Sequence, residues 1–243
     1  MRKFTFVYPY YENSEMFKIQ QRTWASYPEE IRNNLQVIVT DDCSPNNHIA
    51  KSILTGTGVN ISVYRLVRKI RWNWLACKNL GAFKATNPWL LVTDMDHLVS
   101  PEMAQILFET LKVNEQTIYV PSRVNYPNLE LYKPHPNSYV MTRKMYWQVG
   151  GYDEDYSGHY GTDGLYRGRC KQNATVKVLG QDQFYLIQYN REEVSDASTS
   201  DLKRKEGRDP DAIRKVRAWK EEMKRDKVCV HQVPWELIWQ APK

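Results

Sequence analysis

Short apolar runs alternate with segments of helical periodicity through the first half of the chain, and this alternation constrains the fold more than any other feature. Phe4 to Tyr8, Leu35 to Thr40, Ile61 to Leu66 and Trp89 to Thr93 have the composition of strands. Ser14 is the expected N-cap of a helix that runs to about Tyr27. Apolar residues recur at helical spacing again before the fourth run, at Trp72, Leu75, Ala76, Leu80 and Phe83. The alternation predicts an α/β fold with a single Rossmann-like, mostly parallel sheet flanked by helices.

Length and composition are those of a globular protein. With 243 residues, 42% of them hydrophobic and 26% charged, the chain fits one α/β domain. No apolar stretch approaches the roughly 18 residues that a membrane span needs, and we expect no transmembrane segment. The first apolar run ends at Pro9, before a signal peptide could form, so we expect a cytoplasmic protein, in the host cytoplasm if the chain is viral. The four cysteines lie far apart, which indicates reduced thiols rather than a zinc site or disulfides.

The net charge of +6 is concentrated in one segment. Between Asp42 and Asp94 the chain has no acidic residue. The same segment carries seven basic residues, namely Lys51, Arg65, Arg68, Lys69, Arg71, Lys78 and Lys84. A basic stretch bracketed by two strand-end aspartates suits a phosphorylated ligand, because cations lower the cost of bringing an anion into a cleft. The alternative is a solvated basic face that aids solubility.

Asp94-Met95-Asp96 follows the fourth strand, where the ligands of a doubly wound sheet collect. Two alternating carboxylates at a strand end can hold Mn²⁺ or Mg²⁺ against a diphosphate. One of the two side chains can reach the metal while its neighbour contacts ribose or a metal-bound water. The alternative is an Asp-rich turn that binds no metal.

Four segments occur in an order that resembles family 2 glycosyltransferases. They are residues 7–13, 39–44, 76–82 and 93–96, the last followed by Pro101. The resemblance covers roughly residues 4–170 and implies a GT-A fold that moves a sugar from a nucleotide-sugar donor, by preference a UDP-sugar, to an acceptor hydroxyl. The same resemblance implies that Asp96 anchors the cation and that Asp94 assists. It implies donor contacts by Pro9, Tyr11, Glu12, Asp42, Arg71, Lys78 and Asp94.

A second motif runs from Gly150-Gly151-Tyr152-Asp153-Glu154 to Gly161-Thr162-Asp163 and looks like the acceptor-side motif of galactosyltransferases and polypeptide N-acetylgalactosaminyltransferases. A Glu-Asp pair ends that motif, whereas Thr162-Asp163 stands here, with Thr162 as the expected N-cap of a helix. The resemblance implies that Asp163 is the general base of an inverting reaction. It also implies acceptor contacts by Gly151, Tyr160 and Thr162. The alternative for Asp163 is a helix-capping role alone.

A third metal ligand is not obvious from the sequence. Some relatives supply a histidine after this helix, often following a glycine, but here Gln181 follows Gly180. We expect His231 to substitute, although a lone histidine is more often structural. His97, which adjoins the Asp pair, is the other histidine that could face the site.

The last fifth of the chain is polar until it reaches an apolar tail. We expect a GT-A catalytic domain over residues 1–190, with a nucleotide-sugar half (1–100) and an acceptor half (101–190), and a loop or hairpin over 126–136 near the site. Residues 191–243 are expected to form a mobile loop, a basic helix from about Asp211 to Lys227, and a tail, Val233 to Trp239, that docks on the body. Such a loop and docking tail form a lid in many enzymes.

The acceptor is open at this point. The resemblance makes a saccharide the first expectation. The alternative is a bacteriophage-type DNA glycosyltransferase that acts on hydroxymethylated pyrimidines, as the small size and the basic helix Arg214 to Lys227 suggest. A third hypothesis is a non-catalytic module that binds nucleotides or nucleic acid. No sequence feature indicates an oligomeric state.

Overall fold

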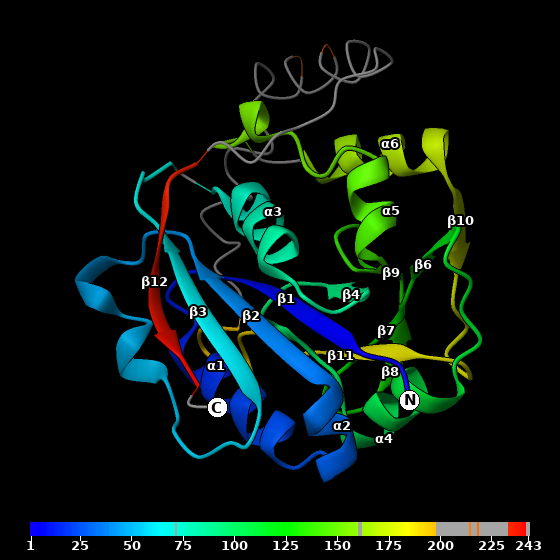
Figure 1. The fold of residues 1–243 in the computed structure, drawn as a ribbon, viewed down its shortest axis with the longest axis horizontal. Helices are drawn as coiled ribbons and strands as arrows, with labels where there is room; N and C mark the ends of the chain where they lie inside the picture. The colour runs from blue at the N-terminus through cyan, green and yellow to red at the C-terminus, as the bar shows by residue number, and fades with distance from the viewer. Residues whose placement is uncertain (71, 160–161, 198–213, 215–217, 219–232, 242–243) are drawn as a thin grey trace.

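The centre of the molecule is an eight-stranded sheet (Figure 1). The computed structural model describes residues 1–70, 72–159, 162–197, 214, 218 and 233–241. In sheet order the strands are β10 (Thr175–Val178), β6 (Thr117–Val120), β9 (Tyr139–Thr142), β4 (Trp89–Val92), β1 (Phe4–Tyr10), β2 (Leu35–Asp41), β3 (Asn60–Leu66) and β12 (Trp235–Gln240). β1 pairs parallel with β2 and β4, β2 with β3 and β6 with β10, whereas β9 and β12 run antiparallel to their neighbours. The predicted α/β fold with a large, mostly parallel sheet is confirmed.

Helices cover both faces of this sheet because its central strands are apolar on both sides. One core receives Phe4, Phe6 and Tyr8 of β1, and the other receives Val7. The first core is covered by α1 (Ser14–Ala25), α2 (Glu29–Asn34), α4 (Pro101–Gln105) and the π-helix η3 (Ile106–Thr110). The second is covered by α3 (Trp74–Lys84), α5 (Arg143–Gln148) and α6 (Asp163–Asn173). Three single turns, η1 (Pro45–Asn47), η2 (Ala50–Ser52) and η4 (Glu154–Tyr156), lie in the connections.

A second sheet of four short strands was not predicted. Its order is β5 (His97–Leu98), β11 (Tyr185–Gln188), β7 (Ser122–Asn125) and β8 (Glu130–Tyr132). β7 and β8 form an antiparallel hairpin, as expected for the region before residue 136. β5 begins directly after Asp96, and the Tyr189 amide that follows β11 donates to the Asp96 carbonyl at 2.9 Å. The small sheet therefore fixes the position of the residues that follow Asp94-Met95-Asp96.

α3 differs from its expected form at both ends. Trp72 precedes the helix in the left-handed region, with φ of 51°, and the helix begins at Trp74. Phe83 was expected to face inward, but its side chain is 55% exposed and its ring centre lies 5.4 Å from the Lys84 ammonium.

None of the described helices is both long and apolar enough to cross a bilayer. Cys43, Cys77 and Cys170 are buried free thiols.

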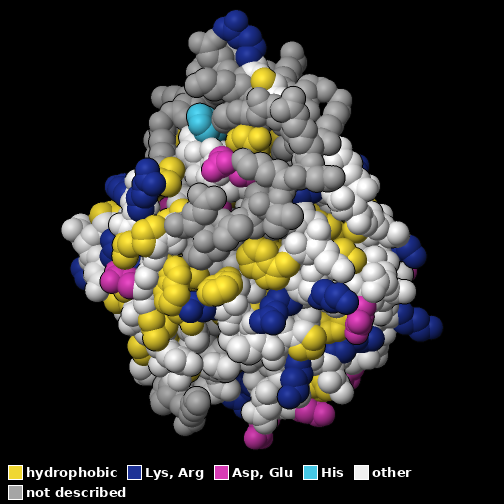
Figure 2. Space-filling model, turned by 45° about the horizontal axis from the view of Figure 1, so that its top comes forward, with side chains coloured by type: hydrophobic (Ala, Val, Ile, Leu, Met, Phe, Trp, Pro, Cys, Tyr) yellow, Lys and Arg dark blue, Asp and Glu magenta, His cyan; other side chains and the backbone are white. Residues whose placement is uncertain are grey.

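Residues 235–240, from the expected docking tail, form β12 at the edge of the large sheet. β12 pairs antiparallel with β3, and the Lys84 ammonium lies 3.5 Å from the centre of the Trp235 ring. Trp235 and Leu237 are among the exposed large hydrophobic residues, and Figure 2 shows hydrophobic side chains interspersed with Lys and Arg on one face of the molecule. The expected mobile loop and nearly all of the expected basic helix lie outside the described residues.

Candidate functional site

The loop after β1 and the end of β2 bring three of the predicted donor residues together. β1 and β2 are parallel and in register, with Tyr10 opposite Asp41, so Tyr11, Glu12 and Asp42 leave the sheet at one edge. Burial and the nearby charges of Glu12 and Asp42 raise the pKa of Tyr11. Pro9, the remaining predicted residue of this loop, is half-buried in β1, and Arg71 lies outside the described residues.

Backbone contacts fix this loop in a strained conformation. Glu12 has φ of 54°, in the left-handed region that non-glycine residues rarely adopt. Its amide donates to the Ser44 hydroxyl at 3.0 Å. Asp42 is buried, and its carboxylate accepts a hydrogen bond of 2.7 Å from the amide of Asn73, just before α3. The loop after β1, the end of β2 and the start of α3 therefore form one hydrogen-bonded unit.

Asp94, at the end of β4, faces a buried lysine. The Lys78 ammonium, on the first half of α3, is 2.7 Å from one Asp94 oxygen and donates to the Asn137 carbonyl at 2.9 Å. Burial lowers the pKa of Lys78, and the charges of Asp94, Asp96 and Asp163 oppose that shift. Burial alone would raise the pKa of Asp94, but Lys78 together with the two nearby histidines holds it well below its usual range. Asp94 is therefore ionised at neutral pH.

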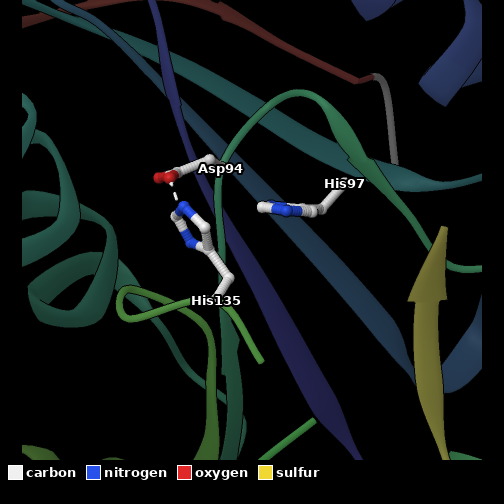
Figure 3. Close-up of side chains that lie close together, drawn as sticks. All are labelled: Asp94, His97 and His135. Carbon is white, nitrogen blue, oxygen red and sulfur yellow. Dashed lines mark ion pairs between the residues drawn. The ribbon is translucent and has the colours of Figure 1, made fainter. Parts of the chain in front are cut away.

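Two histidines complete the surroundings of Asp94 (Figure 3). His135 Nδ1 is 3.5 Å from the second Asp94 oxygen, and the centres of the His135 and His97 rings are 4.6 Å apart. One ligand atom from each of Asp94, His97 and His135 lies within 4.8 Å of the others. Burial lowers the pKa of both imidazoles, that of His135 to about 4. Neutral imidazoles and an ionised carboxylate are the protonation states that metal ligation requires.

His97 also has a spare ligand atom. Its side chain is fully buried, and within the described part of the chain no group forms a hydrogen bond with Nε2. The other nitrogen, Nδ1, lies 3.3 Å from the Thr93 hydroxyl and 3.6 Å from an Asp96 oxygen. A buried ring nitrogen without a partner is costly unless a ligand takes it up. The cluster of Asp94, His97 and His135 thus fits a divalent cation.

The observed cluster differs from the ligand set expected from the sequence. Asp96 is half-buried and meets His97 rather than joining Asp94 and His135, and His231 lies outside the described residues. Sequence reasoning considered His97 but missed His135. His135 stands 41 residues after Asp94 in the loop Pro134-His135-Pro136, so no periodic spacing relates the two.

The glycine-rich part of the second motif is anchored on α3 and α6. The Asn79 side chain accepts from the Tyr152 amide at 2.9 Å and donates to the Tyr152 carbonyl at 2.7 Å. Gly151 has φ of 62°, and a Cβ there would lie 3.0 Å from the Asn79 Oδ1. Arg169 of α6 donates to the Gly151 carbonyl at 3.0 Å and pairs with Asp153 at 3.7 Å. Gly151 therefore has a structural reason to be glycine, separate from any contact with an acceptor.

Asp163 begins α6 on the side of the Asp94 site. It is half-buried, and its charge acts on Lys78 together with the charges of Asp94 and Asp96. Thr162 occupies the N-cap position of α6, as expected, but among the described residues its side chain makes no capping hydrogen bond to the helix. Thr162 has helical backbone angles, and its buried hydroxyl donates to the His159 carbonyl at 3.4 Å. Tyr160 lies outside the described residues.

Comparison with known proteins gives one family and several similar structures. Residues 7–172, more than half of the chain, match Glycosyl transferase family 2. S. aureus TarS 1-349 in complex with UDP-GlcNAc superposes with a TM-score of 0.61 and 16% identity, over 81% of this chain and 61% of that one. The mannosyltransferase PcManGT from Pyrobaculum calidifontis, in complex with GDP-Man and Mn²⁺, superposes with a TM-score of 0.60 and 13% identity, over 94% of this chain and 66% of that one. GalNAc-T7 with UDP, GalNAc and Mn²⁺ superposes with a TM-score of 0.60 and 13% identity, over 78% of this chain and 44% of that one.

These structures are similar to the chain in fold. At identities of 13–16% the likeness carries no residue-level role from one protein to the other. The chain spans less than two thirds of the length of each of the three. No curated protein matches the chain.

Proposed function

Because this chain belongs to glycosyl transferase family 2, we propose that it is a nucleotide-sugar-dependent glycosyltransferase that needs a cation, works with inversion and glycosylates a saccharide hydroxyl. One observation carries the proposal. The three carboxylates expected from two distant motifs, Asp94, Asp96 and Asp163, all act on the buried ammonium of Lys78. This common effect on Lys78 supports the proposal that the cation ligands and the base belong to one site. We propose residues 1–190 as the catalytic unit.

The donor is proposed to bind at the carboxyl ends of β1, β2 and β4. Pro9, Tyr11, Glu12 and Asp42 would hold the base and ribose, with a UDP-sugar as the favoured donor. The hydrogen-bonded unit that they form supports this role, because a site with fixed polar groups loses little entropy when a ligand binds. Lys78, and Arg71 from the same basic segment, would face the diphosphate.

The cation is proposed to bind at Asp94, with His97 and His135 as nitrogen ligands and Asp96 as the second carboxylate. Imidazole ligands suit Mn²⁺ better than Mg²⁺, which prefers oxygen ligands throughout, so we favour Mn²⁺. When bound, the cation supplies positive charge against the departing diphosphate. The Nε2 of His97, which has no hydrogen-bond partner in the described part of the chain, supports this assignment. His231 is retained as a possible further ligand.

Asp163 is proposed as the general base. In an inverting reaction the acceptor hydroxyl loses its proton to the carboxylate while its oxygen bonds to the anomeric carbon and the nucleoside diphosphate leaves. Gly151, Tyr160 and Thr162 are proposed to line the acceptor side. Asp163→Asn keeps the shape of the side chain and removes its basicity, so transfer should fall at least about a hundredfold while donor binding persists. Transfer at the wild-type rate by Asp163→Asn would remove Asp163 from this role.

A thermal-shift screen tests the donor and cation sites together. UDP- and GDP-sugars are added with and without Mn²⁺, since a ligand that binds the native state raises the melting temperature. The shift caused by Mn²⁺ should disappear in His97→Ala and His135→Ala. Gln172→Ala, on the exposed side of α6, is the control and should respond as the wild type does. An unchanged Mn²⁺ shift in both histidine variants would rule out the proposed ligands.

The DNA and binding-module alternatives are separated by two measurements. The basic helix that suggested DNA, Arg214 to Lys227, lies almost wholly outside the described residues, and the saccharide is the proposed acceptor. Binding to DNA would weaken steeply as salt rises, whereas a neutral oligosaccharide would bind almost independently of salt. A non-catalytic module would release no nucleoside diphosphate from any sugar nucleotide.

A further inference from the structure

Asp94 faces two positions for positive charge. One of its oxygens lies 2.7 Å from the Lys78 ammonium, and the other lies 3.5 Å from His135, in the cluster that fits a cation. A single carboxylate therefore serves both an internal cation and the proposed external one. No second carboxylate is within ion-pair distance of Lys78 among the described residues.

The Lys78 ammonium is held where it is. Its side chain is fully buried, so it cannot turn into solvent without moving α3 or its neighbours. The Asn137 carbonyl accepts from it at 2.9 Å, and the ring centres of Trp74 and Tyr152 lie at 5.1 and 5.8 Å. Burial disfavours the charged form of the amine, whereas the carboxylate, the carbonyl and the two aromatic faces favour it. The contacts thus hold the amine of Lys78 in one place beside Asp94.

We infer that Lys78 competes with the divalent cation for Asp94 and thereby makes cation binding depend on the nucleotide diphosphate. The inference rests on the proposed function of this site. Two positive groups that share one partly buried carboxylate repel each other, so the cation alone should bind weakly. A diphosphate brings enough negative charge to balance both. Lys78 then pairs with phosphate as well as with Asp94, and the repulsion is offset.

This competition predicts a reciprocal coupling. If the nucleoside diphosphate raises the affinity for Mn²⁺ by some factor, Mn²⁺ raises the affinity for the nucleotide by the same factor. Couplings between binding sites are typically about 5- to 150-fold. Removing the Lys78 charge should strengthen Mn²⁺ binding to the free protein and shrink the coupling, because the repulsion is then gone before the diphosphate arrives.

Titration of the full chain with Mn²⁺, followed by the electron paramagnetic resonance signal of the free ion, tests the inference. The titration is run without nucleotide, with UDP and with GDP. Lys78→Gln removes the charge but keeps an N–H donor for Asp94 and Asn137. Lys78→Met removes both the charge and the donor. The titration can be carried out with whichever of the two variants folds. Lys84→Met is the matched control, because it removes a cation from the other end of the same helix.

We expect Lys78→Gln or Lys78→Met to bind Mn²⁺ at least about tenfold more tightly than the wild type in the absence of nucleotide, with the gain from nucleotide reduced in proportion. Lys84→Met should match the wild type. If the wild type binds Mn²⁺ and neither Lys78 variant binds it more tightly, the competition is refuted while the cation site stands. If no protein binds Mn²⁺ with or without nucleotide, the cation site of the proposed function is refuted, and the inference with it.

Discussion

Asn79 connects α3 to the glycine-rich motif through every polar atom of its side chain. Its Oδ1 accepts from the Tyr146 hydroxyl and the Tyr152 amide, and its Nδ2 donates to the Tyr152 carbonyl and to Glu154. All of these groups are buried. A buried polar group that loses its partner costs about 1–3 kcal/mol, so a residue with four such bonds is a strong determinant of stability.

We expect Asn79→Ala to lower the free energy of unfolding by about 3 kcal/mol or more, because it leaves several buried groups unpaired at once. Urea denaturation monitored by tryptophan fluorescence measures the change. Asn173→Ala is the control, since Asn173 is exposed on α6 and, among the described residues, its side chain makes one hydrogen bond, to the Arg169 carbonyl. It should change stability by less than about 0.5 kcal/mol. Equal losses in the two variants would contradict this account of Asn79.

The carboxylates of the site were predictable from the sequence, whereas most of their partners were not. Asp42 and Asp94 follow apolar strands, so their place at one sheet edge follows from the strand pattern. His135 comes from a loop, and only the folded hairpin before it brings it to Asp94. The sequence predicted that Lys78 contacts the donor, and the structure also pairs its ammonium with Asp94. Contacts between loops depend on tertiary structure, which a single sequence does not encode in its periodicity.

At the scale of the elements, α3 packs tightly against β1 of the large sheet. Gly81 permits it, because a Cβ there would lie 2.2 Å from a methyl carbon of Val7, in the buried face of β1. Gly168, in the interior of α6, has no atom within 4 Å of the corresponding position. A Cβ at Gly81 would meet the sheet, whereas, among the described residues, one at Gly168 would meet nothing. Replacing each glycine by alanine therefore separates the cost of overpacking from the gain in helix propensity.

Gly81→Ala should destabilise the protein by about 1–3 kcal/mol, because Val7 or the helix must shift to admit the methyl group. Gly168→Ala should stabilise it by about 0.5–1 kcal/mol, because alanine loses less backbone entropy in a helix. Paired thermal or urea denaturation measures both changes. A neutral Gly81→Ala would mean that α3 lies farther from β1 than described here.

Strands that are apolar runs were predictable, whereas the strands of the second sheet were not. β1, β2, β3 and β4 were all expected within one or two residues of their bounds, because each is an apolar run between turn or helix signals. The second sheet was missed because its strands, two to four residues long, mix polar with apolar residues and form no long apolar run. Their pairing is set by neighbours far away in the sequence, as when β11 joins β5 and β7.

At the scale of the whole molecule, segments from the end of the chain contact elements that are far earlier in the sequence. β12 extends the sheet that begins with β1, and Val233 before it donates to the Glu154 carboxylate at 3.2 Å. At the opposite end of the site, Asp196 reaches back to α1. Its carboxylate accepts from the amides of Glu15 and Met16 at 2.7 and 3.0 Å. The first contact ends in the motif that contains Gly151, and the second at the helix that follows Tyr11 and Glu12.

Asp196 therefore caps α1 from 180 residues away. Ser14 was expected to cap this helix, but it is the first helical residue, and Asn13 at the N-cap position uses its side chain elsewhere. Asn13 accepts from the Tyr11 amide at 3.0 Å and donates to the Asp196 carbonyl. A carboxylate at a helix N-terminus pairs with free amides and with the positive end of the helix dipole. The same contacts hold the loop that carries Tyr11 and Glu12.

We expect Asp196→Ala to lower the free energy of unfolding by about 1–2 kcal/mol, because two amides of α1 lose their acceptor. Asp196→Asn keeps one carbonyl acceptor and should recover part of the loss, whereas Glu192→Ala, an exposed acid nearby, should have little effect. The difference between Asp196→Ala and the wild type should also shrink in high salt, because salt screens the charge part of the contact. If Asp196→Ala and Glu192→Ala prove equally stable at low salt, α1 does not depend on the distant carboxylate, and its amides are satisfied by water.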